Sequence, residues 1–175
     1  IASNSTAAEQ TSATSIISYD SDGFTVGTGD NVQYESANGV SWNWKAGNSA
    51  GSANTDGSIN STVSVNTTAG FSIVTYTGNG TNGATVGHGL GVTPSIILVK
   101  VLNTSNIWAM YHKSLGATDY LQFDTSTTTD NNLYWNDTAP TNDVFTIGTA
   151  SPVNVNSNSY VAYCFAEKTG YNKFN

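Results

Sequence analysis

The chain has 175 residues, enough for a domain that buries roughly 70% of its unfolded surface, and a formal net charge of −7 with five lysines and no arginine. So few cations cannot line a phosphate backbone, which excludes nucleic acid as a partner, and no apolar run reaches the ~18 residues that predict membrane insertion. Charged residues make up 10% of the chain, and Asn, Ser, Thr and Gly supply a polar surface that favours strands and tight turns over helices.

The N-terminal third contains short apolar stretches between polar segments. We interpret residues 1–17, which lack periodicity, as a polar linker or strap. Residues 18–47 carry two apolar stretches, at 23–27 and 40–44, and predict a terminal hairpin. Residues 48–57 are rich in Ser, Gly and Asn, and we expect a connector to the main β-sandwich module over residues 58–175.

The strongest strand signals lie in residues 71–113. An alternating stretch is followed by a Gly-Asn turn, the longest apolar run of the chain at 96–102, and a further short strand that ends at His112. We expect Ile97 and Val99 to be buried in a central strand, and Ile96 and Leu98 to face an opposite layer. The reason is that a continuous apolar run predicts cover on both faces.

The remaining elements are predicted as short strands joined by polar turns. Residues 58–67 alternate weakly and suggest an edge strand. Further strands are expected at 120–124, 133–135, 144–148 and 159–165, with a loop at 125–132 and a turn at 136–142. No segment shows sustained helical periodicity. The sequence therefore predicts an all-β, antiparallel β-sandwich of jelly-roll-like form, with glycine-rich turns and little or no helix.

An internal repeat relates the two ends of the chain. Residues 22–28, DGFTVGT, match residues 143–149, DVFTIGT, and without a gap residues 40–44 fall on 161–165. We infer that residues 18–47 correspond to the last hairpin of a preceding repeat, and that residues 71–168 form a whole repeat. Tandem repeats are typical of extended, modular proteins.

The longer motifs resemble repeats in virion structural and tail-fibre-like proteins of marine tailed bacteriophages. They are YTGNG at 76–80, HGLGVTPSIILVK at 88–100, WAMYHKSL at 108–115, WNDTAPT at 135–141, VFTIG at 144–148 and YVAYCFAE at 160–167. The likeness covers residues 18–47 and 58–174. It implies a β-rich fibre or adhesin module at the virion surface or in another extracellular assembly, and it carries over no binding residue.

The titratable residues give little sign of chemistry. His88 and His112 are not spaced as metal ligands, and we expect a turn histidine bonded to backbone at position 88. Cys164 lies in an apolar stretch and is interpreted as a buried small hydrophobe. Asp residues in the polar loops leave calcium binding open, and a glycosidase pair of carboxylates is a weak alternative. We therefore expect no catalytic residue, no cofactor and no transition metal.

Aromatic residues are the candidates for sugar binding. Trp42 and Trp44 share one strand face, but their repeat equivalents Tyr163 and Phe165 are also aromatic, which favours packing. The weak candidates for an exposed glycan site are Trp108, Tyr111, Tyr134 and Trp135. Trp108, Tyr134 and Trp135 have no counterpart in the partial repeat, and Tyr111 lies close to Trp108 in the sequence.

Three functions follow in order of preference. The first is a structural module of a fibre or virion appendage, whose partners are other copies of itself or other virion subunits, with attachment to a host cell-surface glycan as a further role. The second is a lectin-like carbohydrate-binding domain, and the third a glycan-cleaving, tailspike-type enzyme. Because residues 18–47 are an apolar hairpin without their own module, we expect them either to extend the main sandwich or to contact another copy in a homo-oligomer.

Overall fold

The computed structural model describes residues 1–3, 5–29, 32, 38–47, 50–122 and 128–174, and for residues 128–130 the backbone only. The chain divides into two compact units, which we call the sandwich unit, Ile1–Glu9 with Lys45–Asn175, and the hairpin unit, Gln10–Trp44. These boundaries differ from the sequence-based ones, because residues 1–9 belong with the main module.

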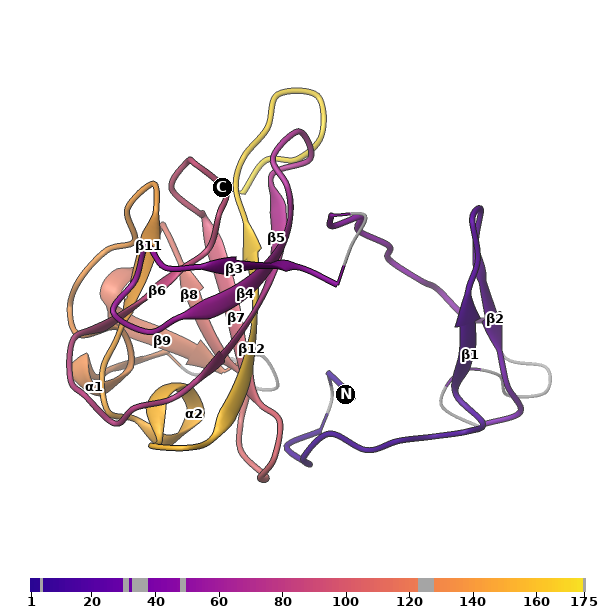
Figure 1. Ribbon diagram of the computed structural model, residues 1–175, viewed down its shortest axis with the longest axis horizontal. Helices are drawn as coiled ribbons and strands as arrows, with labels where there is room; N and C mark the ends of the chain where they lie inside the picture. The colour runs from indigo at the N-terminus through magenta and orange to yellow at the C-terminus, as the bar shows by residue number, and fades with distance from the viewer. Residues whose placement is uncertain (4, 30–31, 33–37, 48–49, 123–127, 175) are drawn as a thin grey trace. The chain divides into compact units, whose positions relative to one another are not determined.

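An eight-stranded antiparallel sheet forms most of the sandwich unit (Figure 1), with the strand order β10-β9-β8-β7-β12-β5-β4-β3. Its strands are β3 (Ser52–Asn54), β4 (Ser61–Asn66), β5 (Phe71–Thr77), β7 (Ile96–Val101), β8 (Ala109–His112), β9 (Gly116–Gln122), β10 (Thr128–Asp130) and β12 (Ser159–Phe165). The last strand, β12, lies in the middle between β5 and β7. The C-terminal part of the chain therefore closes the sheet.

A smaller second layer covers one face of this sheet. It contains the two-stranded antiparallel pair β6 (Ala84–Gly87) and β11 (Val144–Ile147) and the one-turn helices α1 (Asn132–Trp135) and α2 (Ser151–Asn154). The core between the layers is formed by inward residues of β5, β7, β8 and β12 packed against Val86, Phe145 and Ile147. The fold is thus the all-β, antiparallel, sandwich-like fold expected from the sequence.

The second layer covers the central apolar run on one face only. Ile97 and Val99 are fully buried in β7, which confirms the prediction for these two residues. Ile96 and Leu98 are half-buried and alternate with them, so they point to the outer face of the sheet, away from the second layer. The prediction of an opposite layer against Ile96 and Leu98 is therefore wrong.

Two helical turns replace predicted irregular or strand segments. The predicted strand at 133–135 is wrong, because Asn131 caps a helical turn there by accepting a hydrogen bond of 3.0 Å from the Leu133 N–H at its Oδ1 atom. The α2 turn carries Pro152 at its start, where the missing N–H costs nothing. Both helices are single turns of four residues, too short for a periodic apolar pattern.

The edges of the sheet also differ from expectation. The predicted connector at 48–57 contains β3, which is the edge strand and pairs with β4. The segment 58–67, predicted as the edge strand, contains β4, which lies between β3 and β5. The predicted loop at 125–132 contains β10, which pairs with β9. Residues 123–127, which include the end of the predicted strand 120–124, lie outside the described residues.

The hairpin unit contains two paired strands, β1 (Ile16–Tyr19) and β2 (Phe24–Val26). The segment before β1 is joined to the segment after β2, since the Gly27 and Gly29 N–H groups donate to the Ser15 and Thr14 carbonyls. Residues 40–44, predicted as a strand, are in no regular element. A strand is defined by the pairing of its backbone groups with a neighbouring strand, and the structure assigns no such pairing to residues 40–44.

Candidate functional site

The four aromatic residues proposed for glycan binding are buried. Trp108, Tyr111, Tyr134 and Trp135 are exposed by 5%, 4%, 7% and 1% respectively. Tyr134 stacks on Tyr120 with ring centroids 3.6 Å apart, and Trp135 meets Tyr111 edge to face. The expectation of exposed rings at these four positions is therefore wrong, because each ring packs within the sandwich unit.

His88 is fully buried at the end of the β6 strand. Its Nδ1 atom accepts a hydrogen bond of 3.2 Å from the Leu90 N–H, and its Nε2 atom lies 3.3 Å from the Thr141 carbonyl oxygen. This pattern fits a neutral ring that donates from Nε2. Burial lowers the pKa of His88, although the hydrogen bond to Thr141 and the nearby Asp143 and Asp56 raise it in part. The ring is thus a structural link between two loops.

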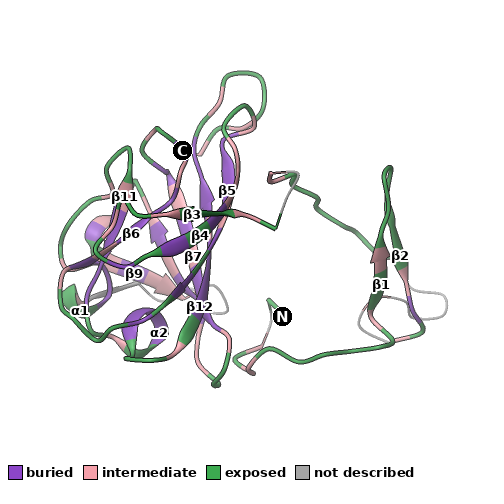
Figure 2. Cartoon of the chain, in the orientation of Figure 1, coloured by how far each residue is buried: buried purple, intermediate pink, exposed green. Residues whose placement is uncertain are grey.

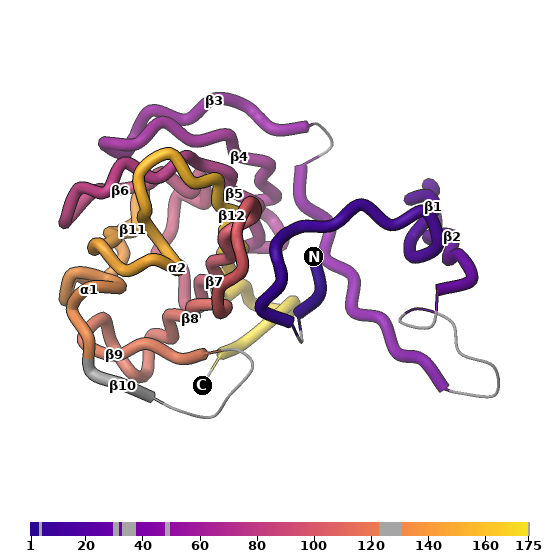
Figure 3. The backbone as a smooth tube through the Cα atoms, turned by 90° about the horizontal axis from the view of Figure 1, so that it is seen from below, coloured from indigo at the N-terminus to yellow at the C-terminus, as the bar shows by residue number. Residues whose placement is uncertain are grey.

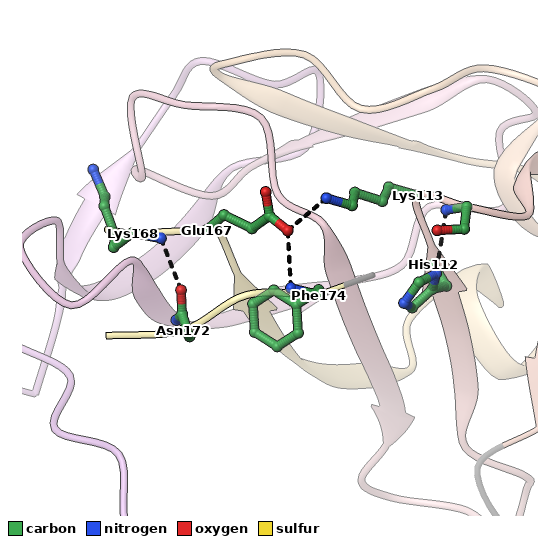
Figure 4. A network of polar contacts seen from close by, with 7 residues as sticks. His112, Lys113, Glu167, Lys168, Asn172 and Phe174 are labelled. Carbon is green, nitrogen blue, oxygen red and sulfur yellow. Dashed lines mark hydrogen bonds and ion pairs between the residues drawn. The ribbon is translucent and has the colours of Figure 1, made fainter. Parts of the chain in front are cut away.

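The other candidate chemical groups are also held in structural roles. Cys164 is fully buried, and burial raises its thiol pKa to about 12, so it is protonated at neutral pH and unsuited to nucleophilic attack. His112 accepts a hydrogen bond of 3.2 Å from the Ser114 N–H at its Nδ1 atom (Figure 4). Among the described residues, no group of three or more His, Cys, Asp or Glu side chains could hold a metal ion.

The described part of the hairpin unit, in contrast, exposes much of its large apolar side chains to solvent. Figure 2 shows β1 and β2 coloured mainly as exposed or intermediate, whereas the strands of the sandwich unit carry buried residues. The large apolar residues at least 36% exposed in this unit are Ile16, Ile17, Tyr19, Phe24, Val40, Trp42 and Trp44. The unit therefore has no apolar core in its described part, and this amount of exposed apolar surface is typical of an interaction site.

Three of these residues form what we call the apolar stripe: Val40, Trp42 and Trp44, exposed by 78%, 76% and 55%. They alternate along the chain, so they share one face when the segment is extended. The residues between them are Ser41 and Asn43, whose side chains are joined by a hydrogen bond of 3.1 Å. The segment from 38 to 44 carries no charge.

A second apolar surface lies on the outer face of the large sheet. We call it the outer row: cross-strand neighbours on β9, β8, β7, β12 and β5, namely Leu121, Met110, Leu98, Tyr163 and Ile73. All five are half-buried. At a strand spacing of about 4.8 Å, the row is about 19 Å long.

Residues 1–3 and 5–9, which we call the N-terminal strap, cover the sheet on one side of the outer row. Figure 3 shows the strap beside the loop that follows β7, where the Glu9 N–H donates to the Leu102 carbonyl and the Asn106 N–H donates to the Thr6 carbonyl. The Trp108 Nε1–H donates to the Ala2 carbonyl at 3.3 Å, and the Trp108 ring stacks on Tyr163. The buried Lys100 ammonium donates to three carbonyl oxygens, of Thr6 at 3.2 Å, Val101 at 3.2 Å and Asn106 at 3.0 Å, and burial lowers its pKa.

The C-terminal segment covers the sheet on the other side of the row. Glu167 accepts hydrogen bonds at Oε1 from the Lys113 ammonium at 2.6 Å and from the Phe174 N–H at 2.8 Å (Figure 4). The Phe174 ring then packs edge to face on Phe165, an outer-face residue of β12. The Lys113 ammonium and the Phe174 N–H lower the pKa of the Glu167 carboxyl. The strap and this segment thus lie on the two sides of the half-buried outer row.

The comparison with protein families includes the hairpin unit. A family model described as "Domain of unknown function (DUF7483)" matches residues 1–175. The chain belongs to the DUF7483 family. Its exposed hairpin unit is therefore part of the region that defines a DUF7483 domain. No curated protein and no solved structure matches the chain.

Sequence reasoning on this DUF7483 chain placed the exposed aromatic residues in the wrong unit. The repeat favoured packing for Trp42 and Trp44, yet these two are exposed, whereas the four glycan candidates are buried. The sequence signal against packing was that the residues alternating with the stripe, Gly39, Ser41 and Asn43, are small or polar. Their repeat equivalents Tyr160, Ala162 and Cys164 are fully buried in β12, so residues 39–43 cannot supply a matching core face. No described helix is long and apolar enough to cross a membrane.

Proposed function

We propose that this protein is a structural module of an extracellular or virion assembly, such as a fibre or appendage, and that the apolar stripe joins it to another copy. The observation that carries the proposal is the hairpin unit, which exposes its large apolar side chains and has no apolar core in its described part. A two-stranded hairpin is marginally stable alone in water, so covering its exposed apolar side chains by association would stabilise it. The low charge, the internal repeat and the resemblance to fibre-like repeats support the same role.

The outer row of a second copy is the surface that fits the stripe. An extended stripe spans about 13 Å, which is shorter than the row, and both surfaces are uncharged. Two Trp and one Val at these exposures offer about 400 Å² of apolar surface. A reciprocal exchange, in which each copy gives its stripe and receives its partner's, would bury roughly 1,600 Å², the size of a standard specific interface.

Sedimentation velocity over a range of protein concentrations tests the proposal. We expect the full chain to form dimers or larger species, and the Trp42→Ser, Trp44→Ser double variant to stay monomeric with an unchanged circular dichroism spectrum. A matched control, Tyr171→Ser, removes another exposed aromatic residue, outside the stripe, and should associate like the parent chain. A monomeric parent at high concentration, or a double variant that associates as strongly, contradicts the proposal.

Attachment to a glycan is the second candidate, and the exposed rings of Trp42 and Tyr19 favour it. Flat aromatic faces in water can stack on the apolar face of a sugar ring. Titration with a panel of polysaccharides, followed by tryptophan fluorescence, separates the two roles. Saturable binding that is lost in Trp42→Ser supports glycan attachment. Association of copies without any change of fluorescence on adding glycan supports the structural role and contradicts glycan attachment.

A further inference from the structure

Three Asn-Gly pairs occur in the chain: Asn38–Gly39, Asn79–Gly80 and Asn82–Gly83. In such pairs the backbone nitrogen of the glycine can attack the side-chain amide carbon of the asparagine, because glycine has no Cβ to hinder the approach. The reaction needs a free glycine N–H and a backbone that can turn toward the side chain. The surroundings of each pair therefore decide which one reacts.

The two pairs in the sandwich unit are held against this reaction. The Gly80 N–H donates to the Asn154 Oδ1 atom at 3.2 Å, and the Gly83 N–H donates to the Ile147 carbonyl at 3.0 Å. The side chains are fixed as well, since Asn79 Oδ1 accepts from the Thr81 N–H and Asn82 Nδ2 donates to Asn136 Oδ1, both at 2.9 Å. Each attack must break these bonds first.

The pair in the hairpin unit is open. Asn38 and Gly39 are both exposed and lie in no helix or strand. No heavy atom of the described residues lies within 4 Å of the position that a Cβ on Gly39 would occupy, apart from its chain neighbours. The described residues thus give Gly39 no neighbour that would hinder rotation of its peptide unit.

We propose that Asn38 is a self-modification site that deamidates while Asn79 and Asn82 persist. The Gly39 nitrogen loses its proton to solvent base and bonds to the Asn38 Cγ atom, and the side-chain nitrogen leaves as ammonia. Water then opens the resulting succinimide at either carbonyl, which gives aspartate or isoaspartate. One water is consumed and one ammonia released, and no other reactant is needed.

The modification places a negative charge two residues before the apolar stripe. Val40 and Trp42 share the strand face with position 38 when the segment is extended. This regulatory part rests on the proposed function: a carboxylate beside a surface that loses water on association disfavours that association. Asn38 then acts as a timer that weakens assembly as the protein ages.

Peptide mapping by mass spectrometry, with isoaspartate detection, tests the modification during incubation of the folded full chain at mildly alkaline pH. We expect Asn38 to convert at least about tenfold faster than Asn79 or Asn82, because a held glycine amide must first give up its hydrogen bond. In urea the three rates should converge, and Gly39→Ala should slow conversion at Asn38. Equal rates in the folded protein, or faster conversion at Asn79 or Asn82, overturn the assignment.

Sedimentation of Asn38→Asp beside Asn38→Gln tests the regulatory part. We expect the Asp variant to associate about tenfold more weakly than the Gln variant, which keeps the neutral amide. Equal association of the two variants overturns the timer while leaving the modification site in place. A parent chain that does not associate at all overturns both the timer and the proposed function, but not the modification site, which is decided by the mass measurement.

Discussion

Phe24 and Phe145 occupy equivalent positions in the internal repeat, yet Phe24 is 36% exposed and Phe145 is fully buried. The difference lies in their strands' surroundings. Phe145 is on β11, which pairs with β6 over the sheet, whereas β2, which carries Phe24, pairs with β1 in a two-stranded hairpin. The same local sequence thus finds a core in one unit and none in the described part of the other, and this contrast underlies the proposed self-association.

The central strand should not tolerate charge. Val99 is fully buried in β7, so Val99→Asp places a carboxylate where it has neither water nor a partner, and we expect no soluble folded protein. The control Thr75→Asp changes an exposed residue of β5, and its free energy of unfolding should lie within about 0.5 kcal/mol of that of the parent chain. Soluble expression and thermal melting measure both effects, and an unchanged melting temperature in Val99→Asp would show that the strand assignment is wrong.

Asn154 should be a strong determinant of stability. It is 1% exposed and makes four hydrogen bonds: Oδ1 accepts from the Asn79 and Gly80 N–H groups, and Nδ2 donates to the Thr81 and Gly148 carbonyls. Asn154→Ala leaves these groups without that partner and should lower the free energy of unfolding by about 3 kcal/mol.

Urea denaturation measures this change. The exposed neighbour Asn156, replaced by Ala, is the matched control and should change the free energy by less than about 0.5 kcal/mol. A comparable loss in both variants would mean that the Asn154 side chain does not organise the turns around it.

His88 should make the protein less stable in mild acid. Its pKa is lowered in the folded chain by burial, so the unfolded chain binds the proton more readily. The contribution of the neutral His88 ring to the free energy of unfolding is fully present above the pKa of histidine in the unfolded chain, about 6.5. This contribution is lost as the pH falls through the lower pKa of His88 in the folded chain. We expect the urea concentration at the unfolding midpoint to decrease as the pH is lowered from 7.5 to 5.5. The slope should flatten in His88→Gln and persist in His112→Gln, and an equal slope in all three proteins would exclude His88 as its source.

The N-terminal strap should stabilise the sandwich unit through the buried Lys100. Deleting residues 1–9 removes the Thr6 carbonyl from the Lys100 ammonium and exposes Trp108, and it should cost about 2–4 kcal/mol. The same deletion should cost less in a Lys100→Met background, where no buried cation loses a partner. A double-mutant cycle by urea denaturation measures the coupling, and additive losses would show that the strap and Lys100 act independently.

The sequence predicted the fold better than the surfaces. Alternation and the apolar run placed β5, β7, β8, β11 and β12 because each follows from local periodicity. The short elements were missed for a local reason too, since a one-turn helix such as α1 depends on a cap at Asn131 rather than on any period. Which aromatic residues are exposed depends on which strands find partners, and the repeat hid this by aligning the exposed Trp42 with the half-buried Tyr163.

Crosslinking between isotopically distinct copies tests the self-association most directly. A photoreactive phenylalanine analogue at position 42, in a mixture of light and heavy chains, records what the apolar stripe touches in solution. We predict light–heavy crosslinks from position 42 to the peptides that contain Leu98 and Met110 of the outer row. Crosslinks found only within single copies, or none above those of the same probe at position 171, would contradict the account.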